Sequence, residues 1–302
     1  MKNRGHITKS LTILFGLLVL IVYVCLLPNS VVSAQTSPKP LGLTLSPLRS
    51  ELSIAPGTSL DGALTVTNST NKPMAVDASA EEFSVIDQQY DYAFTAESDV
   101  AKWVTFNPSE VDLSVGASKK MTFTVGVPLS AEPGGRYISL FASTKTGTSD
   151  DGVNSLQRVA SLLYITVSGD VTRAGHLVTL TSPWEISGNN TWSAAIQNTG
   201  TTHFRSRYNV EVRNIFGDGA VASASGDALI LPGTVRLVSD ILPAPQLPGI
   251  YKVVYTIGLG DTPAKTETRF VLYAPVWSVI VIIAVATASI LVLSRRRRPN
   301  RR

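Results

Sequence analysis

Apolar and polar residues alternate through much of the middle of this chain. Two runs illustrate the pattern, with apolar members at Met121, Phe123, Val125 and Val127, and at Tyr251, Val253, Tyr255, Ile257 and Leu259. Successive side chains of a strand point to opposite faces of its sheet, so this spacing predicts strands with one buried face. Short strands separated by Pro-Gly, Asp-Gly and Asn-rich turns favour antiparallel β-sandwiches over a parallel sheet. The only helices that we expect lie in two continuous apolar runs at the ends.

The first apolar run covers residues 11–27 and follows a basic segment that contains Lys2, Arg4 and Lys9. Small residues at Val32-Ser33-Ala34 then provide a cleavage site. This arrangement is typical of a secretory signal peptide, which we place at residues 1–34. An uncleaved N-terminal anchor is the alternative, because a run of this length approaches that of a membrane span.

The second apolar run extends from Val276 to Leu293 and carries no charge. Its length is about that needed to cross a hydrocarbon layer of ~30 Å, so it predicts a transmembrane helix at residues 275–294. The basic tail at residues 295–302 follows directly. Positive charge next to a span marks the cytoplasmic side, which predicts a single-pass protein of the cell membrane with an extracytoplasmic ectodomain.

The charges are divided unevenly between the ends and the middle of the chain. Nine of the 26 Lys and Arg residues flank the two apolar runs, and all 22 Asp and Glu residues lie between Lys39 and Glu267. The middle therefore has a net charge of 17 − 22 = −5, against +4 for the whole chain. The excess of Lys and Arg in the whole chain therefore reflects its predicted membrane topology, and we expect no nucleic-acid partner.

A repeat divides the middle segment into two parts. Gly116, an alternating strand, a Val-Pro pair and Pro133-Gly134-Gly135-Arg136-Tyr137 recur as Gly233, another alternating strand, a Leu-Pro pair and Pro248-Gly249-Ile250-Tyr251. We therefore expect two tandem immunoglobulin-like β-sandwich domains, at residues 35–170 and 171–274. Tyr137 and Tyr251 resemble the tyrosine corner of such folds, in which the hydroxyl bonds back to the backbone.

The residues of the predicted ectodomain favour no catalytic chemistry. Cys25 leaves with the signal peptide, and His176 and His203 have no acidic or thiol neighbours at the spacing of metal ligands. No nucleophile elbow, acyl-enzyme signature or phosphate-binding glycine loop occurs. We expect a non-enzymatic protein without metal or cofactor.

The most unusual stretch is residues 81–99, where acidic and aromatic residues are interleaved. Aromatic faces stack on sugar rings and carboxylates accept hydrogen bonds from hydroxyls, so Tyr90, Tyr92 and Phe94 are candidate ligand contacts. The alternative is a hairpin whose aromatic side chains cover one edge of the sandwich.

One segment of the chain resembles a known family of bacterial surface proteins. The similarity runs from Leu43 to Val167 and rests on Trp103-Val104-Thr105-Phe106-Asn107-Pro108, Val111-Asp112-Leu113 with Gly116, Phe123-Thr124-Val125-Gly126-Val127-Pro128, and Pro133 to Tyr137. This segment is similar to the first ectodomain of proteins that interact with WxL-type cell-wall proteins. The resemblance implies a peptidoglycan-binding sandwich, a second immunoglobulin-like sandwich, a membrane helix and a basic tail.

Topology and resemblance together favour a non-enzymatic, membrane-anchored cell-surface protein that attaches to peptidoglycan or a cell-wall protein and serves adhesion. Its expected partners are the lipid bilayer and a cell-wall polymer or surface protein. The alternative is an extracytoplasmic assembly factor, a chaperone-like scaffold that holds surface subunits through an edge strand.

Overall fold

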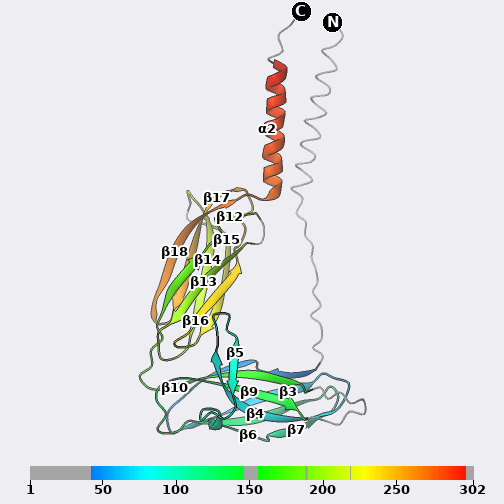
Figure 1. The fold of residues 1–302 in the computed structure, drawn as a ribbon, viewed down its shortest axis with the longest axis vertical. Coiled ribbons are helices and arrows are strands. Elements are labelled where there is room, and N and C mark those ends of the chain that lie inside the picture. Colours follow the sequence, from blue (N-terminus) through cyan, green and yellow to red (C-terminus); the bar gives the residue numbers. More distant parts are fainter. Residues whose placement is uncertain (1–41, 146–155, 188–189, 218, 297–302) are drawn as a thin grey trace, which may run out of the picture.

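The computed structural model describes residues 42–145, 156–187, 190–217 and 219–296, which form four β-sheets and one long helix (Figure 1). The predicted signal peptide at residues 1–34 lies outside the described residues, as do residues 297–302 of the basic tail. The fold is all-β and immunoglobulin-like, as the alternating pattern predicts.

Two sheets between Leu43 and Val167 form what we call the first sandwich. One sheet has the strand order β1-β3-β8-β6, and the other has β2-β10-β9-β4-β5 with β7 also paired to β4. The strands are β1 (Leu43–Ser46), β2 (Arg49–Ile54), β3 (Ser59–Asn68), β4 (Met74–Val85), β5 (Tyr92–Thr95), β6 (Val104–Asn107), β7 (Glu110–Leu113), β8 (Ser118–Gly126), β9 (Gly134–Thr144) and β10 (Arg158–Val167), and a short 3₁₀ helix, η1 (Ala101–Trp103), precedes β6.

Two further sheets between Gly175 and Tyr273 form the second sandwich. The smaller sheet has the order β11-β13-β16, and the larger has β12-β18-β17-β14-β15. Its strands are β11 (Gly175–Thr181), β12 (Glu185–Ile186), β13 (Thr191–Asn198), β14 (Phe204–Asn214), β15 (Ala220–Ile230), β16 (Val235–Ile241), β17 (Gly249–Leu259) and β18 (Thr262–Tyr273). The predicted domain boundary at residues 170 and 171 falls in the connection between β10 and β11 and stays a prediction.

The period-two pattern places the cores. In β8, Met121, Phe123 and Val125 are at most 3% exposed, whereas the alternate residues point to solvent. The alternating residues of β17 are likewise buried, namely Tyr251, Val253, Tyr255, Ile257 and Leu259. Since the buried faces of two sheets meet in each sandwich, every alternating strand contributes one row of side chains to a core.

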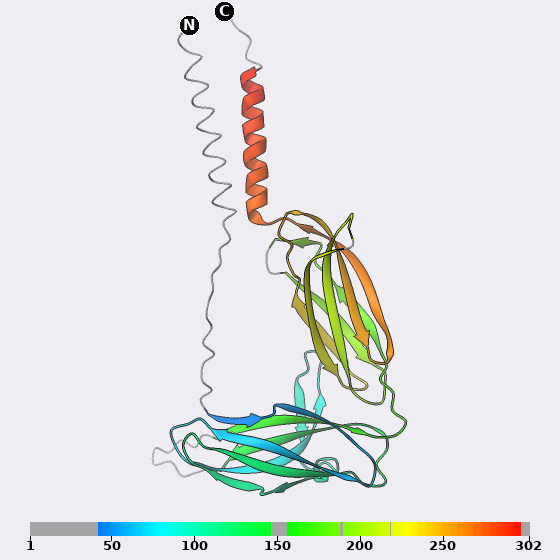
Figure 2. The same ribbon diagram turned by 180° about the vertical axis from the view of Figure 1, so that it is seen from behind.

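The two sandwiches share a hydrophobic cluster at their junction. Phe83, Tyr90, Tyr137 and Tyr164 of the first sandwich belong to the same buried cluster as the core of the second. The hairpin formed by β4 and β5 rises from the first sandwich toward the second, which is visible from both sides (Figures 1 and 2). Continuous packing of this kind fixes the orientation of the two bodies more firmly than a flexible linker does.

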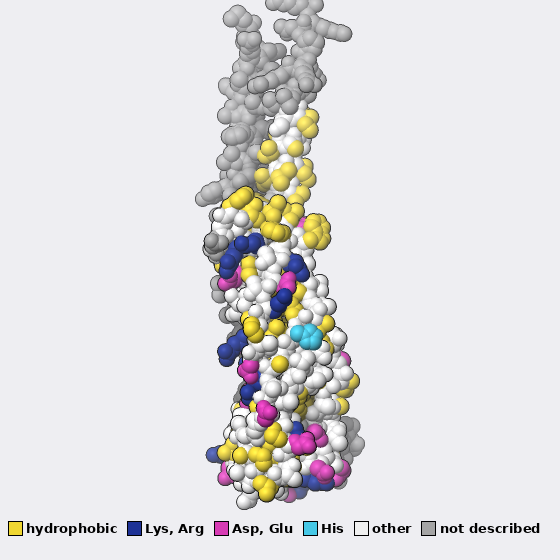
Figure 3. All heavy atoms as spheres, turned by 90° about the vertical axis from the view of Figure 1, so that its left-hand side faces the viewer, with side chains coloured by type: hydrophobic (Ala, Val, Ile, Leu, Met, Phe, Trp, Pro, Cys, Tyr) yellow, Lys and Arg dark blue, Asp and Glu magenta, His cyan; other side chains and the backbone are white. Residues whose placement is uncertain are grey.

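Helix α2 (Val276–Arg296) follows β18 directly and leaves the far end of the second sandwich. Hydrophobic side chains gather along it and on the adjoining end of the sandwich (Figure 3). Within the described part of the chain, no helix has both the length and the apolar character that a membrane crossing requires. The predicted span at residues 275–294 is therefore unsupported, and the prediction of a single-pass membrane location is wrong on this finding.

Candidate functional site at the sandwich junction

Tyr90 connects the two sandwiches through its hydroxyl. It lies at the tip of the β4–β5 hairpin with a positive φ of 72° and is 5% exposed. Its hydroxyl accepts a hydrogen bond from the Leu231 amide at 2.8 Å and bonds the Thr234 hydroxyl at 2.8 Å. The Arg236 guanidinium stacks 4.3 Å from the ring centroid. Burial raises the pKa of Tyr90, so this contact is made by the neutral phenol.

The other two candidate ligand contacts occupy different surroundings. Tyr92 is half-buried, and its ring meets Phe83 edge-on with the centroids 5.2 Å apart. Phe94 remains 42% exposed and contacts Phe141 with the centroids at 5.2 Å. The structure thus brings Tyr90 and Tyr92 into the junction and leaves Phe94 toward solvent. Contact of these three residues with a ligand stays a prediction.

His203 is a junction residue that the sequence pattern did not single out. It is 6% exposed, and its ring packs against Tyr137 and Tyr164 with centroid distances of 5.6 and 5.5 Å. Burial lowers the pKa of His203 to about 4, so the imidazole is neutral near neutral pH. A single histidine just before a strand gives no sequence signal of such a position, because its neighbours come from the other sandwich.

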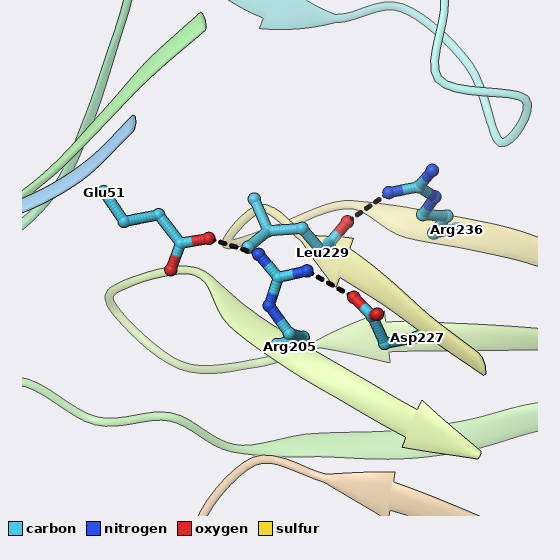
Figure 4. A network of polar contacts seen from close by, with 5 residues as sticks. All are labelled: Glu51, Arg205, Asp227, Leu229 and Arg236. Atoms are coloured by element: carbon cyan, nitrogen blue, oxygen red, sulfur yellow. Dashed lines mark hydrogen bonds and ion pairs between the residues drawn. The ribbon is translucent and has the colours of Figure 1, made fainter. Parts of the chain in front are cut away.

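A polar cleft of about 470 Å³ opens beside this aromatic packing. It is lined by Glu51, Leu52, Ser53, Thr166, Arg173, His203, Phe204, Arg205, Arg207, Gly260 and Asp261. Arg205 on β14 forms ion pairs with Glu51 on β2 and with Asp227 on β15 (Figure 4). A single guanidinium thus joins the edge strand of the first sandwich to the edge strand of the second.

Strand β15 ends its sheet and pairs with β14 alone among the described strands. The Leu229 carbonyl points away from β14, as its hydrogen bond shows. The oxygen accepts this bond from Arg236 on β16 at 2.6 Å (Figure 4). Backbone direction alternates along an antiparallel strand, so Ser223, Ser225 and Asp227 also present their amides and carbonyls outward. No hydrogen bond of the described chain reaches these outward groups. They form what we call the open segment of β15, residues 223–227.

The closed end of the same strand shows what satisfies an edge. The Leu229 carbonyl is bonded by Arg236, and the next outward amide, that of Leu231, donates to the Tyr90 hydroxyl. On β16, the Leu237 amide donates to the carbonyl of Gln88 in the hairpin at 2.8 Å. The first sandwich therefore covers one end of this edge and leaves the open segment uncovered.

The described residues contain no group of three or more histidine, cysteine or acidic side chains arranged to hold a metal ion. The junction combines paired charges, aromatic packing and unpaired backbone groups.

No family model and no curated protein matches this chain. Solved structures with a similar fold include the class 5 fimbriae chaperone CfaA, at 12% identity, covering 78% of this chain and 100% of that chain, with a TM-score of 0.39. A structure of the Salmonella enterica SafA pilin in complex with the SafB chaperone matches at 12% identity, covering 78% and 97%, with a TM-score of 0.38. The YadV chaperone matches at 9% identity, covering 76% and 100%, with a TM-score of 0.39.

These findings correct the main functional interpretation of the sequence. The prediction of a membrane-anchored binder of peptidoglycan or a wall protein is contradicted, because no helix in the described part of the chain can span a membrane. At these TM-scores the likeness to the solved structures carries no argument about what this chain does. Membership in the WxL-interacting family stays a prediction.

Proposed function

We propose that this chain is a chaperone-like scaffold that holds an extended segment of another protein by adding it as a strand to β15. The observation that carries the proposal is the open segment, whose outward amides and carbonyls have no partner within the described chain. A strand edge of this kind is a template for main-chain hydrogen bonds from an incoming peptide.

The side chains of β15 support the same function. Over eleven residues the strand has one charged side chain, Asp227, and that carboxylate is paired with Arg205. The others are small or apolar, with Ala222, Ala224 and Gly226 half-buried on the inner face. Lys and Pro, which natural proteins place on edges to prevent pairing, are absent from this strand.

The junction gives the scaffold its rigidity. The shared cluster and the Tyr90 hydrogen bonds hold the first sandwich against the closed end of β15. A partner segment therefore meets an edge whose position is already fixed, so little ordering of the scaffold is needed on binding.

The experiment uses the full-length chain and a synthetic octapeptide of alternating Val and Thr as the probe. Hydrogen exchange followed by mass spectrometry should show slower exchange in the peptide covering residues 223–227 when the probe is present. Ser225→Pro removes one outward amide without breaking a bond to β14, and it should abolish this protection. Ser225→Ala keeps the amide and is the matched control, which should bind as the natural chain does.

Two results would overturn the proposal: binding of the probe without protection of residues 223–227, or equal binding by Ser225→Pro and Ser225→Ala. A thermal melt of both variants checks that each one is folded.

A further inference from the structure

The open segment of β15 faces a carboxylate that has no cationic partner. Asp240 lies on β16, on the same face of that strand as the buried Val238. It pairs across the sheet with Trp192, whose side chain is in the core, and it is itself half-buried. Its carboxylate accepts hydrogen bonds from the Tyr208 hydroxyl at 2.9 Å and from the Ile241 amide at 2.7 Å. No Lys or Arg of the described chain forms an ion pair with it.

Tyr208 shows that this carboxylate lies beside β15. Tyr208 on β14 is directly opposite Gly226 on β15, and its hydroxyl lies so close that a Cβ added at Gly226 would be 2.3 Å from it. The phenol therefore passes over the edge strand and reaches Asp240 on the opposing sheet. Burial, and then the Asp240 carboxylate, raise the pKa of Tyr208 to about 12, so the phenol stays a donor to Asp240.

Strands β15 and β16 face each other along a line that we call the seam. The two ends of this seam differ in charge. At the closed end, the Arg236 guanidinium is engaged by the Leu229 carbonyl and the Tyr90 ring. At the open end, two neutral donors bind Asp240 and leave its charge uncompensated. A half-buried carboxylate without a cation is unfavourable, and a cation brought within reach relieves that cost.

We propose that the segment held by β15 is basic at one inward-facing position, where a Lys or Arg side chain pairs with Asp240. A strand added beyond β15 directs alternate side chains toward the seam, and the position opposite Gly226 is the one above Asp240. Since Gly226 has no side chain, the Tyr208 phenol lies over it, and a long basic side chain from the added strand approaches Asp240 beside this phenol. The inference rests on the proposed function, because it names a feature of the segment bound at the same edge.

The test compares three octapeptides on the full-length chain by isothermal titration calorimetry. The first is the neutral Val–Thr probe, the second has Lys in place of one central Val, and the third has Lys in place of one central Thr. The second and third have equal net charge and differ only in the face that carries the Lys. We expect the Val-to-Lys peptide to bind about fivefold more tightly than the Thr-to-Lys peptide, the usual gain for a partly exposed ion pair.

Asp240→Asn is the deciding variant, because its oxygen can still accept the bond from the Ile241 amide and its NH2 can donate to the Tyr208 hydroxyl, but the side chain carries no charge. It should remove the fivefold preference and leave binding of the neutral probe unchanged. A preference that persists in Asp240→Asn, or no preference in the natural chain, overturns the inference while the neutral probe still reports on the proposed function. Loss of binding by all three peptides would instead overturn the proposed function itself.

Discussion

The larger sheet in the second sandwich ends in β15 on one side and in β18, with the two-residue strand β12 beyond it, on the other, and these two sides differ in how they are protected. Strand β18 pairs with β12 over only two residues, so most of its outer side is also open. It carries Pro263, Lys265, Glu267 and Arg269, and the acid lies within 3.5 Å of both cations. Strand β15 has no proline and a single charge that is already paired.

This difference separates a protected edge from a receptive one. A proline removes an amide, and charged side chains must lose water when a second strand approaches. The same sheet thus has one edge that resists pairing and one that permits it. Exposure alone does not distinguish the proposed binding strand, β15, since most residues of β18 are also exposed.

Removal of the protecting residues should have the largest effect. We expect the quadruple variant Pro263→Thr, Lys265→Thr, Glu267→Thr and Arg269→Thr to bind a second copy of the Val–Thr probe, so that the stoichiometry in calorimetry rises from one to two. Hydrogen exchange should locate the new protection in residues 262–271. The reverse change, Ser223→Lys with Ser225→Lys, should remove the original site. A quadruple variant that still binds one probe would show that charge and proline do not distinguish the edges.

The strands themselves could be predicted from the sequence, whereas the edges could not. Alternation identified β8 and β17 because their buried positions repeat every second residue. A local pattern does not say which strand ends a sheet, and β15 is rich in alanine and serine with little apolar contrast. The partners of Leu229 and Leu231 come from β16 and from the hairpin of the first sandwich, which only the tertiary structure brings together.

The two repeated tyrosines show the same limit. Tyr251 forms the predicted tyrosine corner, with its hydroxyl donating to the Leu247 carbonyl at 2.7 Å. Tyr137 occupies the equivalent place in the first repeat, yet its buried hydroxyl has no hydrogen-bond partner in the described chain. Its ring packs against His203 of the second sandwich instead. The local motif is shared, and the contact between sandwiches decides the outcome.

Acid should loosen the junction that covers the closed end of β15. Burial lowers the pKa of His203 to about 4 in the folded chain, compared with its ordinary value of 6.5. Between these pH values the unfolded chain binds the proton and the folded chain does not, so stability decreases as pH falls from 6.5 toward 4. The contribution of this residue is on the order of 3 kcal/mol over that range. Chemical denaturation at pH 7 and pH 4.5 measures it.

His203→Gln is the comparison for this pH dependence, because glutamine does not titrate. The variant should lose less stability than the natural chain between the two pH values, whatever its stability at pH 7. Parallel curves for both proteins would show that burial of His203 does not contribute.

Loss of the Tyr90 hydroxyl should lengthen the open segment with a smaller effect on stability. Tyr90→Phe keeps the ring under Arg236 and removes the oxygen that accepts the Leu231 amide. A buried amide without a partner costs about 2 kcal/mol, which denaturant unfolding should detect. Exchange at Leu231 should become faster, because this amide depends on the hairpin and not on a neighbouring strand. Thr234→Val is the control, since it removes the other partner of the phenol and the hydroxyl that donates to the Leu231 carbonyl, but leaves the bond from the Leu231 amide to Tyr90 in place. If the Leu231 amide exchanges as slowly in Tyr90→Phe as in the natural chain, the hairpin does not protect this end of β15. The whole length of β15, and not the open segment alone, must then be compared with β18.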